Sequence, residues 1–219
     1  MTARYRFLVA DDHPLFRGAL KEALAGMAEP SDIIEAGNFD DAKAAISANR
    51  DLDLVLLDLS MPGASGLSGL ISLRGIDSDV PMVVVSAQDD PETIRRALEL
   101  GASGFIPKSG SMDEIRSAVE TVLAGGIASP SSIDLGVERD PEISNLLHRI
   151  GSLTPQQTRV LGMLAEGLLN KQIAYELRVS EATIKAHVSA VLQKLGVDSR
   201  TQAVILLAKI GTDPAQIGR

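Results

Sequence analysis

The stretch "LVLLDLSMPGASG", Leu54 to Gly66, decides the fold of this chain. Four apolar residues run straight into Asp58, and Met61 and Pro62 break the run three residues later. An unbroken Leu/Val run is typical of a parallel strand that is buried on both faces. Because burying an unpaired carboxylate is costly, the aspartate that ends this strand must have partners in its surroundings.

The first half of the chain alternates between strands and helices. We expect strands at 4–10, 32–36, 53–58, 80–87 and 104–108, and helices at 14–27, 39–49, 68–75, 90–101 and 111–126. This alternation predicts an α/β fold with a doubly wound, five-stranded parallel sheet. With the flavodoxin-like strand order 2-1-3-4-5, a ligand would bind beyond the carboxyl ends of the first and third strands.

The alternation stops at "AGGIASPSSIDLGVERD", residues 124–140, where Gly, Ser and Pro cluster without apolar periodicity. Such a composition indicates a linker. We therefore predict a first domain at 1–126, a linker at 127–150 that could include a short helix at 141–149, and a second domain at 151–219. The second domain is expected to be all-α, with helices at 154–168, 170–179, 180–196 and 199–211.

Charge separates the two halves of the chain. Residues 1–150 carry 13 Lys and Arg against 24 Asp and Glu, whereas residues 151–219 carry 8 against 5. The net charge of −8 therefore hides a positive second half, which suits a nucleic-acid partner. The chain has no cysteine, no signal-peptide pattern and no apolar run long enough to span a bilayer, so we expect a cytoplasmic protein without a membrane partner.

Charged and polar residues lie where the predicted strands end. They are Asp11 and Asp12 after the first strand, Asp58 at the third, Ser86 at the fourth and Lys108 at the fifth. Clustered carboxylates repel one another unless a cation joins them, and oxygen ligands of this kind suit Mg²⁺. A carboxylate can also act as a nucleophile and form an aspartyl-phosphate. Each aspartate alone would more often be a helix cap or a loop residue, but the combination of all five positions favours a phosphoryl site.

The motifs "ADDHPLFR", "LLDLSMPGASG", "VVVSA" and "GFIPK" resemble those of the receiver domains of bacterial two-component response regulators, over about residues 4–125. The resemblance implies that Asp58 is the phosphoacceptor and that Asp11, Asp12, Asp58 and the backbone carbonyl of Ser60 hold Mg²⁺. It also implies that Ser86 and Lys108 contact the phosphoryl group and that Phe105 is the aromatic switch residue. Phenylalanine is often buried, so the alternative is that Phe105 is an ordinary core residue.

The second half contains a helix-turn-helix pattern, with a short turn at "RVS" between two predicted helices. In the second of these helices, one apolar face is formed by Ile184, Val188, Val191, Leu192 and Leu195. The opposite face is small or polar, which suits a helix that enters a major groove. The segment from "LTPQQ" to "RTQAV" resembles the LuxR-type output domain of NarL/FixJ response regulators over about residues 151–211.

The resemblance to LuxR-type domains implies two functional surfaces. The candidate DNA contacts are Thr183, Lys185, Ala186, His187, Ser189 and Lys194. The last helix would pair two copies through Ala203, Val204 and Leu207, although these residues could instead pack on their own domain. Two departures bear on DNA affinity: Gln156-Gln157 replaces a pair that usually contains Glu, and Ser189 replaces a residue that is often basic.

These observations favour a transcription regulator switched by phosphorylation. A sensor histidine kinase would phosphorylate Asp58, and the receiver would then release the output helices to form a homodimer on double-stranded DNA. The protein would not be an enzyme beyond Mg²⁺-dependent self-phosphorylation and slow self-dephosphorylation. An aspartate-nucleophile phosphohydrolase is disfavoured because such enzymes typically carry a second Asp where this chain has Ser60. A ligand-sensing LuxR-type regulator is disfavoured by the intact acidic pocket, and a receiver that dimerises without phosphorylation stays open.

Overall fold

Five parallel strands form a single sheet in the order β2-β1-β3-β4-β5, as predicted. The strands are β1 (Tyr5–Ala10), β2 (Ser31–Ala36), β3 (Leu54–Asp58), β4 (Met82–Ser86) and β5 (Gly104–Pro107). The computed structural model describes residues 5–25, 27, 31–63, 66–130 and 141–211. Strands β1 and β3 are neighbours, so the crevice between their carboxyl ends is the switch point of the sheet.

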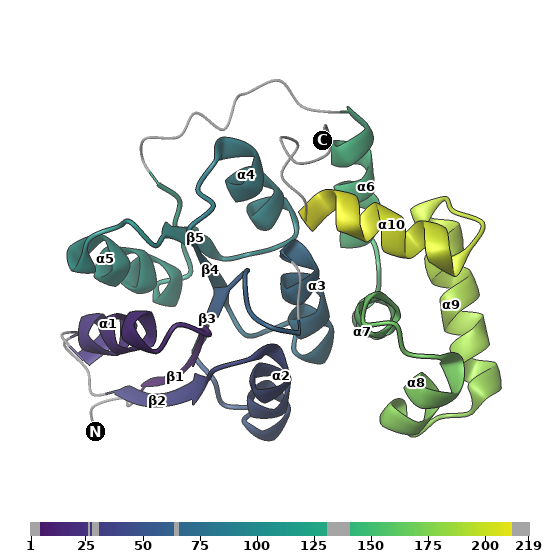
Figure 1. Cartoon of the computed structure of the whole chain (residues 1–219), viewed down its shortest axis with the longest axis horizontal. Coiled ribbons are helices and arrows are strands. Elements are labelled where there is room, and N and C mark those ends of the chain that lie inside the picture. The colour runs from purple at the N-terminus through teal and green to yellow at the C-terminus, as the bar shows by residue number, and fades with distance from the viewer. Residues whose placement is uncertain (1–4, 26, 28–30, 64–65, 131–140, 212–219) are drawn as a thin grey trace.

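Helices cover both faces of the sheet (Figure 1). Helices α1 (Pro14–Ala25) and α5 (Met112–Leu123) lie on one face, and α2 (Phe39–Ala48), α3 (Leu67–Ile76) and α4 (Pro91–Glu99) lie on the other. Alternate residues of β3 point to opposite faces of the sheet. Leu54 and Leu56 pack toward α1 and α5, whereas Val55 and Leu57 pack toward α2, α3 and α4. Burial on both sides explains why the run before Asp58 is apolar at every position.

The second half is helical, with α6 (Pro141–Gly151), α7 (Pro155–Ala165), α8 (Asn170–Leu177), α9 (Glu181–Leu195) and α10 (Arg200–Gly211). Helix α6 lies inside the range predicted as linker. A small core of Val160, Leu164, Ile173 and Ile184 joins α7, α8 and α9. The turn between α8 and α9 gives the helix-turn-helix arrangement that the sequence pattern predicted. The exact domain boundaries stay a prediction.

The two halves pack together through α3 and α7. A Cβ on Gly75 would lie 2.6 Å from the backbone of Arg159, and a Cβ on Gly162 would lie 2.8 Å from the hydroxyl of Ser72. Glycine at both positions therefore lets the two helix backbones approach closely. Neither contact was predicted from the sequence.

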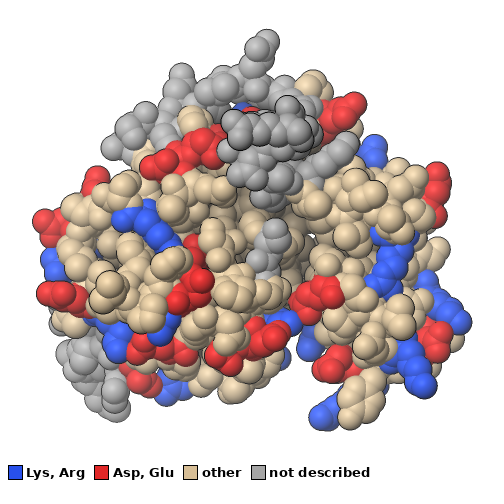
Figure 2. Space-filling model, viewed as in Figure 1, with Lys and Arg blue, Asp and Glu red and all other residues tan. Residues whose placement is uncertain are grey.

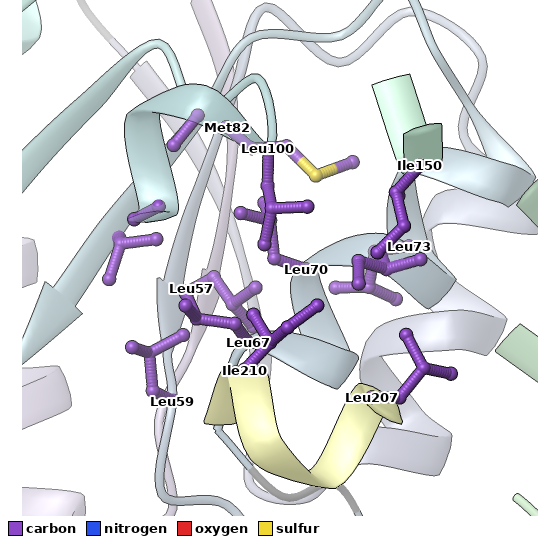
Figure 3. Packing of buried hydrophobic residues seen from close by; sticks show 14 of the residues in the cluster. Leu57, Leu59, Leu67, Leu70, Leu73, Met82, Leu100, Ile150, Leu207 and Ile210 are labelled. Atoms are coloured by element: carbon purple, nitrogen blue, oxygen red, sulfur yellow. The ribbon is translucent and has the colours of Figure 1, made fainter. Parts of the chain in front are cut away.

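Helix α10 also packs on the first half of the chain, next to the contact between α3 and α7. Figure 3 shows Ile210 beside Leu67 of α3, and Ile150 of α6 beside Leu73. These residues belong to one hydrophobic cluster that runs from the sheet into the helical half. The apolar side of α10 is therefore covered partly by the first half of the chain and partly by α7 and α9.

Candidate functional site

The acidic pocket forms at the carboxyl ends of β1, β3 and β5. Asp11 is 1% exposed and Asp58 is 3% exposed. Lys108 reaches both, with its Nζ 2.7 Å from Asp11 Oδ2 and 2.8 Å from Asp58 Oδ2. The unusual aspartate at the end of the apolar run is therefore paired with an ammonium group, which offsets the cost of burial.

The Lys108 ammonium is kept charged by its partners. Burial works against the charge, but the hydrogen bonds and the electrostatic attraction of Asp11 and Asp58 outweigh it and raise the pKa of Lys108. The backbone N–H of Lys108 donates to the carbonyl oxygen of Ser86 at 2.8 Å. This bond fixes the residue at the end of β5 beside the end of β4, so that its side chain points into the pocket.

Asp12 and His13 complete one side of the pocket. One ligand atom from each of Asp11, Asp12, His13 and Asp58 can be chosen so that all lie within 4.8 Å of one another. Asp12 Oδ1 is buried and, within the described part of the chain, receives no hydrogen bond of good geometry, although His13 Nδ1 lies 2.7 Å away. The carboxylates of Asp11, Asp12 and Asp58, one of which has a buried oxygen without a well-aligned hydrogen bond, form a donor set that suits a hard divalent cation.

Ser60 and Ser86 lie at the rim of the pocket. The Ser60 N–H donates to Asp58 Oδ1 at 3.1 Å, which orients the carboxylate from the loop that follows β3. The Ser86 hydroxyl, at the buried end of β4, accepts a 3.0 Å hydrogen bond from the N–H of Gln88. Ser86 therefore ties the loop before α4 to the pocket.

Phe105 is buried on β5, next to Val84 of β4. Its backbone N–H donates to the carbonyl oxygen of Ala128 at 2.8 Å, and the Ala128 N–H donates in turn to the carbonyl oxygen of Ser103. The segment that follows α5 is thus held at the edge of β5, a contact that the sequence did not predict. The proposed switching role of Phe105 stays a prediction.

The residues predicted to contact DNA lie together on α9. Thr183, Lys185, Ala186, Ser189 and Lys194 are exposed, and His187 is partly exposed. The opposite side packs inward, with Ile184, Val191 and Leu195 buried and Val188 and Leu192 partly buried. In Figure 2, Lys and Arg side chains recur along the outer edge of the helical half. The outer face of α9 is therefore open in this conformation, and α3 of the first half contacts α7 and α10 instead.

Two candidate contacts on α9 already have partners within the chain. Lys185 Nζ lies 3.1 Å from Glu181 Oε1, one turn earlier on the exposed face. Lys194 Nζ donates to Gln157 Oε1 at 2.9 Å and to the carbonyl oxygen of Ser152 at 2.8 Å. Because Gln157 is neutral, Lys194 is oriented toward the start of α7 without an ion pair to any residue of the described segments. Its positive charge remains for a phosphate.

The side chains predicted to form a dimer contact are packed inside the chain in this conformation. Ala203 and Leu207 are buried and Val204 is partly buried. The apolar cluster that contains Ala203 and Leu207 includes Leu67 and Leu70 of α3, and it also includes Leu161, Val191 and Leu195 of α7 and α9. If the same side chains pair two copies of the chain, α10 must first move away from the helices that cover it.

Comparison with known proteins identifies the class of protein. Residues 7–120 match the response regulator receiver domain, and residues 151–207 match the bacterial regulatory proteins of the luxR family. The chain therefore belongs to the response regulators that join a receiver to a luxR-type domain, as the resemblance implied. Membership makes it a transcriptional response regulator with a DNA-binding luxR-type domain.

Individual relatives support this membership along nearly the whole chain. The glycerol metabolism activator of Pseudomonas putida is 40% identical over 208 residues, which cover 92% of this chain and 94% of that protein. The nitrate/nitrite response regulator NarP of Escherichia coli is 33% identical over 211 residues, covering 92% and 94%. A structure of the RcsB response regulator of Salmonella typhimurium shares the fold, with a TM-score of 0.57 and 22% identity over 93% of this chain and 99% of that one.

Of the helices in the described segments, none is both long enough and apolar enough to cross a bilayer.

Proposed function

We propose that this response regulator is switched by phosphorylation of Asp58 by a sensor histidine kinase. The main support is the position of the Asp58 carboxylate, which lies at the end of β3 in an acidic pocket, with Oδ2 2.8 Å from Lys108 Nζ. A carboxylate so placed can attack a phosphoryl group, and the ammonium can attract the oxygens that arrive with it. We propose no other enzymatic activity than self-phosphorylation and slow loss of the phosphoryl group.

The donor set fits Mg²⁺, with ligands from the carboxylates of Asp11, Asp12 and Asp58 and from the backbone carbonyl of Ser60. When bound, the cation neutralises charge on the carboxylates and on the phosphoryl oxygens. Asp11 accepts a 2.7 Å hydrogen bond from the N–H of His13 through Oδ1, which holds this carboxylate toward the pocket. Lys108 and the metal would then share the charge of the phosphoaspartate.

Ser86 is the proposed first step in signal transmission. A phosphoryl group brings roughly two negative charges and three strong acceptor oxygens. The Ser86 hydroxyl would turn to one of these oxygens and give up the hydrogen bond with Gln88. The loop before α4 and the neighbouring Phe105 would then be free to shift.

Release of α10 is the proposed output of the switch. Helix α10 packs against α3 of the receiver, and movement of α4 would loosen this packing because Arg96 of α4 donates to the end of α10. Freed α10 helices would pair two copies through Ala203, Val204 and Leu207. A homodimer presents two α9 helices to two half-sites of double-stranded DNA.

The exposed face of α9 would read the DNA, with Thr183, Lys185, Ala186, His187, Ser189 and Lys194 as contacts. Since the protein acts on DNA, we place it in the cytoplasm. The 40% identical relative is named for the activation of glycerol metabolism, so promoters of glycerol genes are the first to test.

Phosphotransfer to Asp58→Asn tests this function. The wild-type chain should take up a phosphoryl group from acetyl phosphate with Mg²⁺, and the variant should take up none, as measured on a phosphate-affinity gel. Asp113→Asn is the matched control because its side chain is 91% exposed on α5, outside the pocket. Labelling of Asp58→Asn at the wild-type rate would show that another residue is the acceptor.

A further inference from the structure

Lys108 contacts a third group besides its two carboxylate partners. Its Nζ lies 5.0 Å from the centre of the Phe16 ring in α1. The Lys108 side chain is only 15% exposed, so the two carboxylates and the ring replace most of its water. An ammonium group within about 6 Å of a ring centre is attracted by the negative face of the aromatic system.

Phe16 lies in the first turn of α1, next to a residue that is anchored to the pocket loop. Arg17 Nη1 donates to the carbonyl oxygen of Asp11 at 2.7 Å, and the Arg17 N–H donates to the carbonyl oxygen of His13 at 3.0 Å. Phe16 itself packs against the buried cluster between α1, α5 and the sheet. The bonds of Arg17 hold the backbone next to Phe16 against the loop that carries Asp11 and Asp12, and the cluster fixes the ring from the other side.

Phosphorylation changes the Asp58 carboxylate that binds Lys108 but leaves the Phe16 ring unchanged. Once Asp58 carries a phosphoryl group, its carboxyl oxygens no longer form a free carboxylate, and Lys108 has to turn toward the phosphoryl oxygens. The attraction of the ring does not depend on Asp58 and has little directional preference across its face. The Phe16 ring can therefore keep the Lys108 ammonium in place while its side chain reorients, and can limit the access of water to it.

We propose that Phe16 is a positioning residue for Lys108 in phosphotransfer to Asp58. The inference rests on the proposed function of Asp58 and adds a residue to that site. In the reaction with acetyl phosphate, a carboxylate oxygen of Asp58 forms a bond to phosphorus. The bond from phosphorus to the bridging oxygen breaks, and acetate leaves with the electron pair. Phe16 acts by keeping the Lys108 ammonium beside the phosphoryl oxygens during this exchange.

Phe16→Leu tests the inference because leucine retains an apolar side chain and removes the aromatic face. The rate of phosphorylation by acetyl phosphate with Mg²⁺ should fall roughly threefold to tenfold in the full-length chain. Phe16→Tyr, which keeps the ring, should restore the wild-type rate. Leu15→Ala is the matched control, since Leu15 is the neighbouring residue of α1 and is 91% exposed. Its rate should equal that of the wild type.

A double-mutant cycle separates positioning from a loss of structure. In a Lys108→Met background, Phe16→Leu should cause no further decrease, because the ammonium on which the ring acts is gone. A structural defect would cause the same decrease in both backgrounds. If thermal unfolding shows that Phe16→Leu is destabilised, Phe16→Met provides a second apolar replacement for the same cycle.

The outcomes distinguish this inference from the proposed function. Failure of the wild type to take up a phosphoryl group, or labelling of Asp58→Asn, would overturn the proposed function itself. If the wild type is phosphorylated at Asp58, the inference is overturned by an unchanged rate in Phe16→Leu, by a tyrosine variant as slow as the leucine variant, or by equal decreases with and without Lys108.

Discussion

Nη1 of Arg96 in α4 donates a 3.1 Å hydrogen bond to the carbonyl oxygen of Ile210 near the end of α10. Arg96 is 3% exposed, and its guanidinium also binds the Glu92 carboxylate one turn earlier. A cation at the C-terminal end of a helix interacts favourably with the helix dipole and its free carbonyls. The residue therefore links the helix that follows Ser86 to the helix proposed to form the dimer.

Replacement of Arg96 should release α10 without phosphorylation. A buried hydrogen bond to a charged group contributes about 1.5 to 3 kcal/mol, so we expect Arg96→Met to raise the dimer population of the unphosphorylated chain at least tenfold. Sedimentation equilibrium measures this population directly. Arg50→Met is the matched control, because Arg50 also donates to the end of a helix, at Ile76, but is exposed. A monomeric Arg96→Met chain would show that this bond does not restrain α10.

A methyl group on Gly162 should separate α3 from α7. Its Cβ would lie 2.8 to 3.0 Å from the hydroxyl, Cα and Cβ of Ser72, and overpacking of this kind costs about 1 to 3 kcal/mol. We expect faster amide hydrogen exchange in α3 and α7 of Gly162→Ala, with exchange in the central strands of the sheet unchanged. Gly18→Ala is the control, since a Cβ there meets nothing within 4 Å. Equal exchange in both variants would mean that the joint tolerates the extra atom.

The sequence was sufficient to predict the sheet and the pocket for a physical reason. Buried parallel strands leave continuous apolar runs, and the polar residues at their carboxyl ends meet in one crevice once the strand order is known. Asp11, Asp58 and Lys108 were predicted to converge in this way, and the structure brings them within hydrogen-bonding distance.

The packing between the two halves was not predicted. Ser72 and Gly162 come from helices that are separated by the whole of β4, β5 and three further helices, and no periodic pattern connects them. A glycine inside a helix lowers helix stability by roughly 1 kcal/mol relative to alanine. Gly75 and Gly162 inside predicted helices are therefore the sequence feature that could have indicated close packing of two helices. The partner of each helix could be identified only from the fold.

The ion pair across the joint predicts a dependence of stability on pH. Lys43 of α2 donates to Glu166 Oε2 at 2.8 Å, and Ser72 donates to the other oxygen of the same carboxylate at 3.0 Å. Burial opposes the charge on Lys43, but the bonds to Glu166 and Asp40 outweigh burial and raise the pKa of Lys43 above 10.5. A raised pKa in the folded state stabilises the chain below its ordinary value and loses this effect as the pH rises through the folded-state value.

We therefore expect the wild type to be more stable than Lys43→Met at neutral pH, and the difference to shrink once the pH exceeds 10.5. Urea unfolding of the two proteins at several pH values measures the difference in unfolding free energy. Lys21→Met is the comparison variant, because Lys21 is more exposed and pairs with Glu35 within the receiver. A difference for Lys43→Met that stays constant as the pH is raised well above 10.5 would show that its ammonium does not carry the effect.

The exposed lysines of α9 predict how DNA affinity should depend on salt. Removal of one lysine that binds a phosphate should reduce the slope of log affinity against log salt by about 1. The hydrogen bond to Gln157 orients Lys194 toward the start of α7, where we expect it to contact a phosphate. Lys194→Ala should therefore weaken binding to all DNA sequences alike and reduce the slope by about 1. Lys185 lies earlier on the open face, where a base contact is worth about 1 to 3 kcal/mol.

Lys185→Ala should therefore weaken binding to a DNA site selected by the wild type by roughly 5-fold to 150-fold, and weaken binding to unrelated DNA much less. Fluorescence anisotropy at several salt concentrations, with the selected and the unrelated duplex, separates the two effects. Lys171→Ala is a suitable control, since this exposed lysine lies on α8 and outside the predicted reading face. If Lys185→Ala weakened both duplexes equally, Lys185 would contact phosphate, and sequence would be read by other residues of α9.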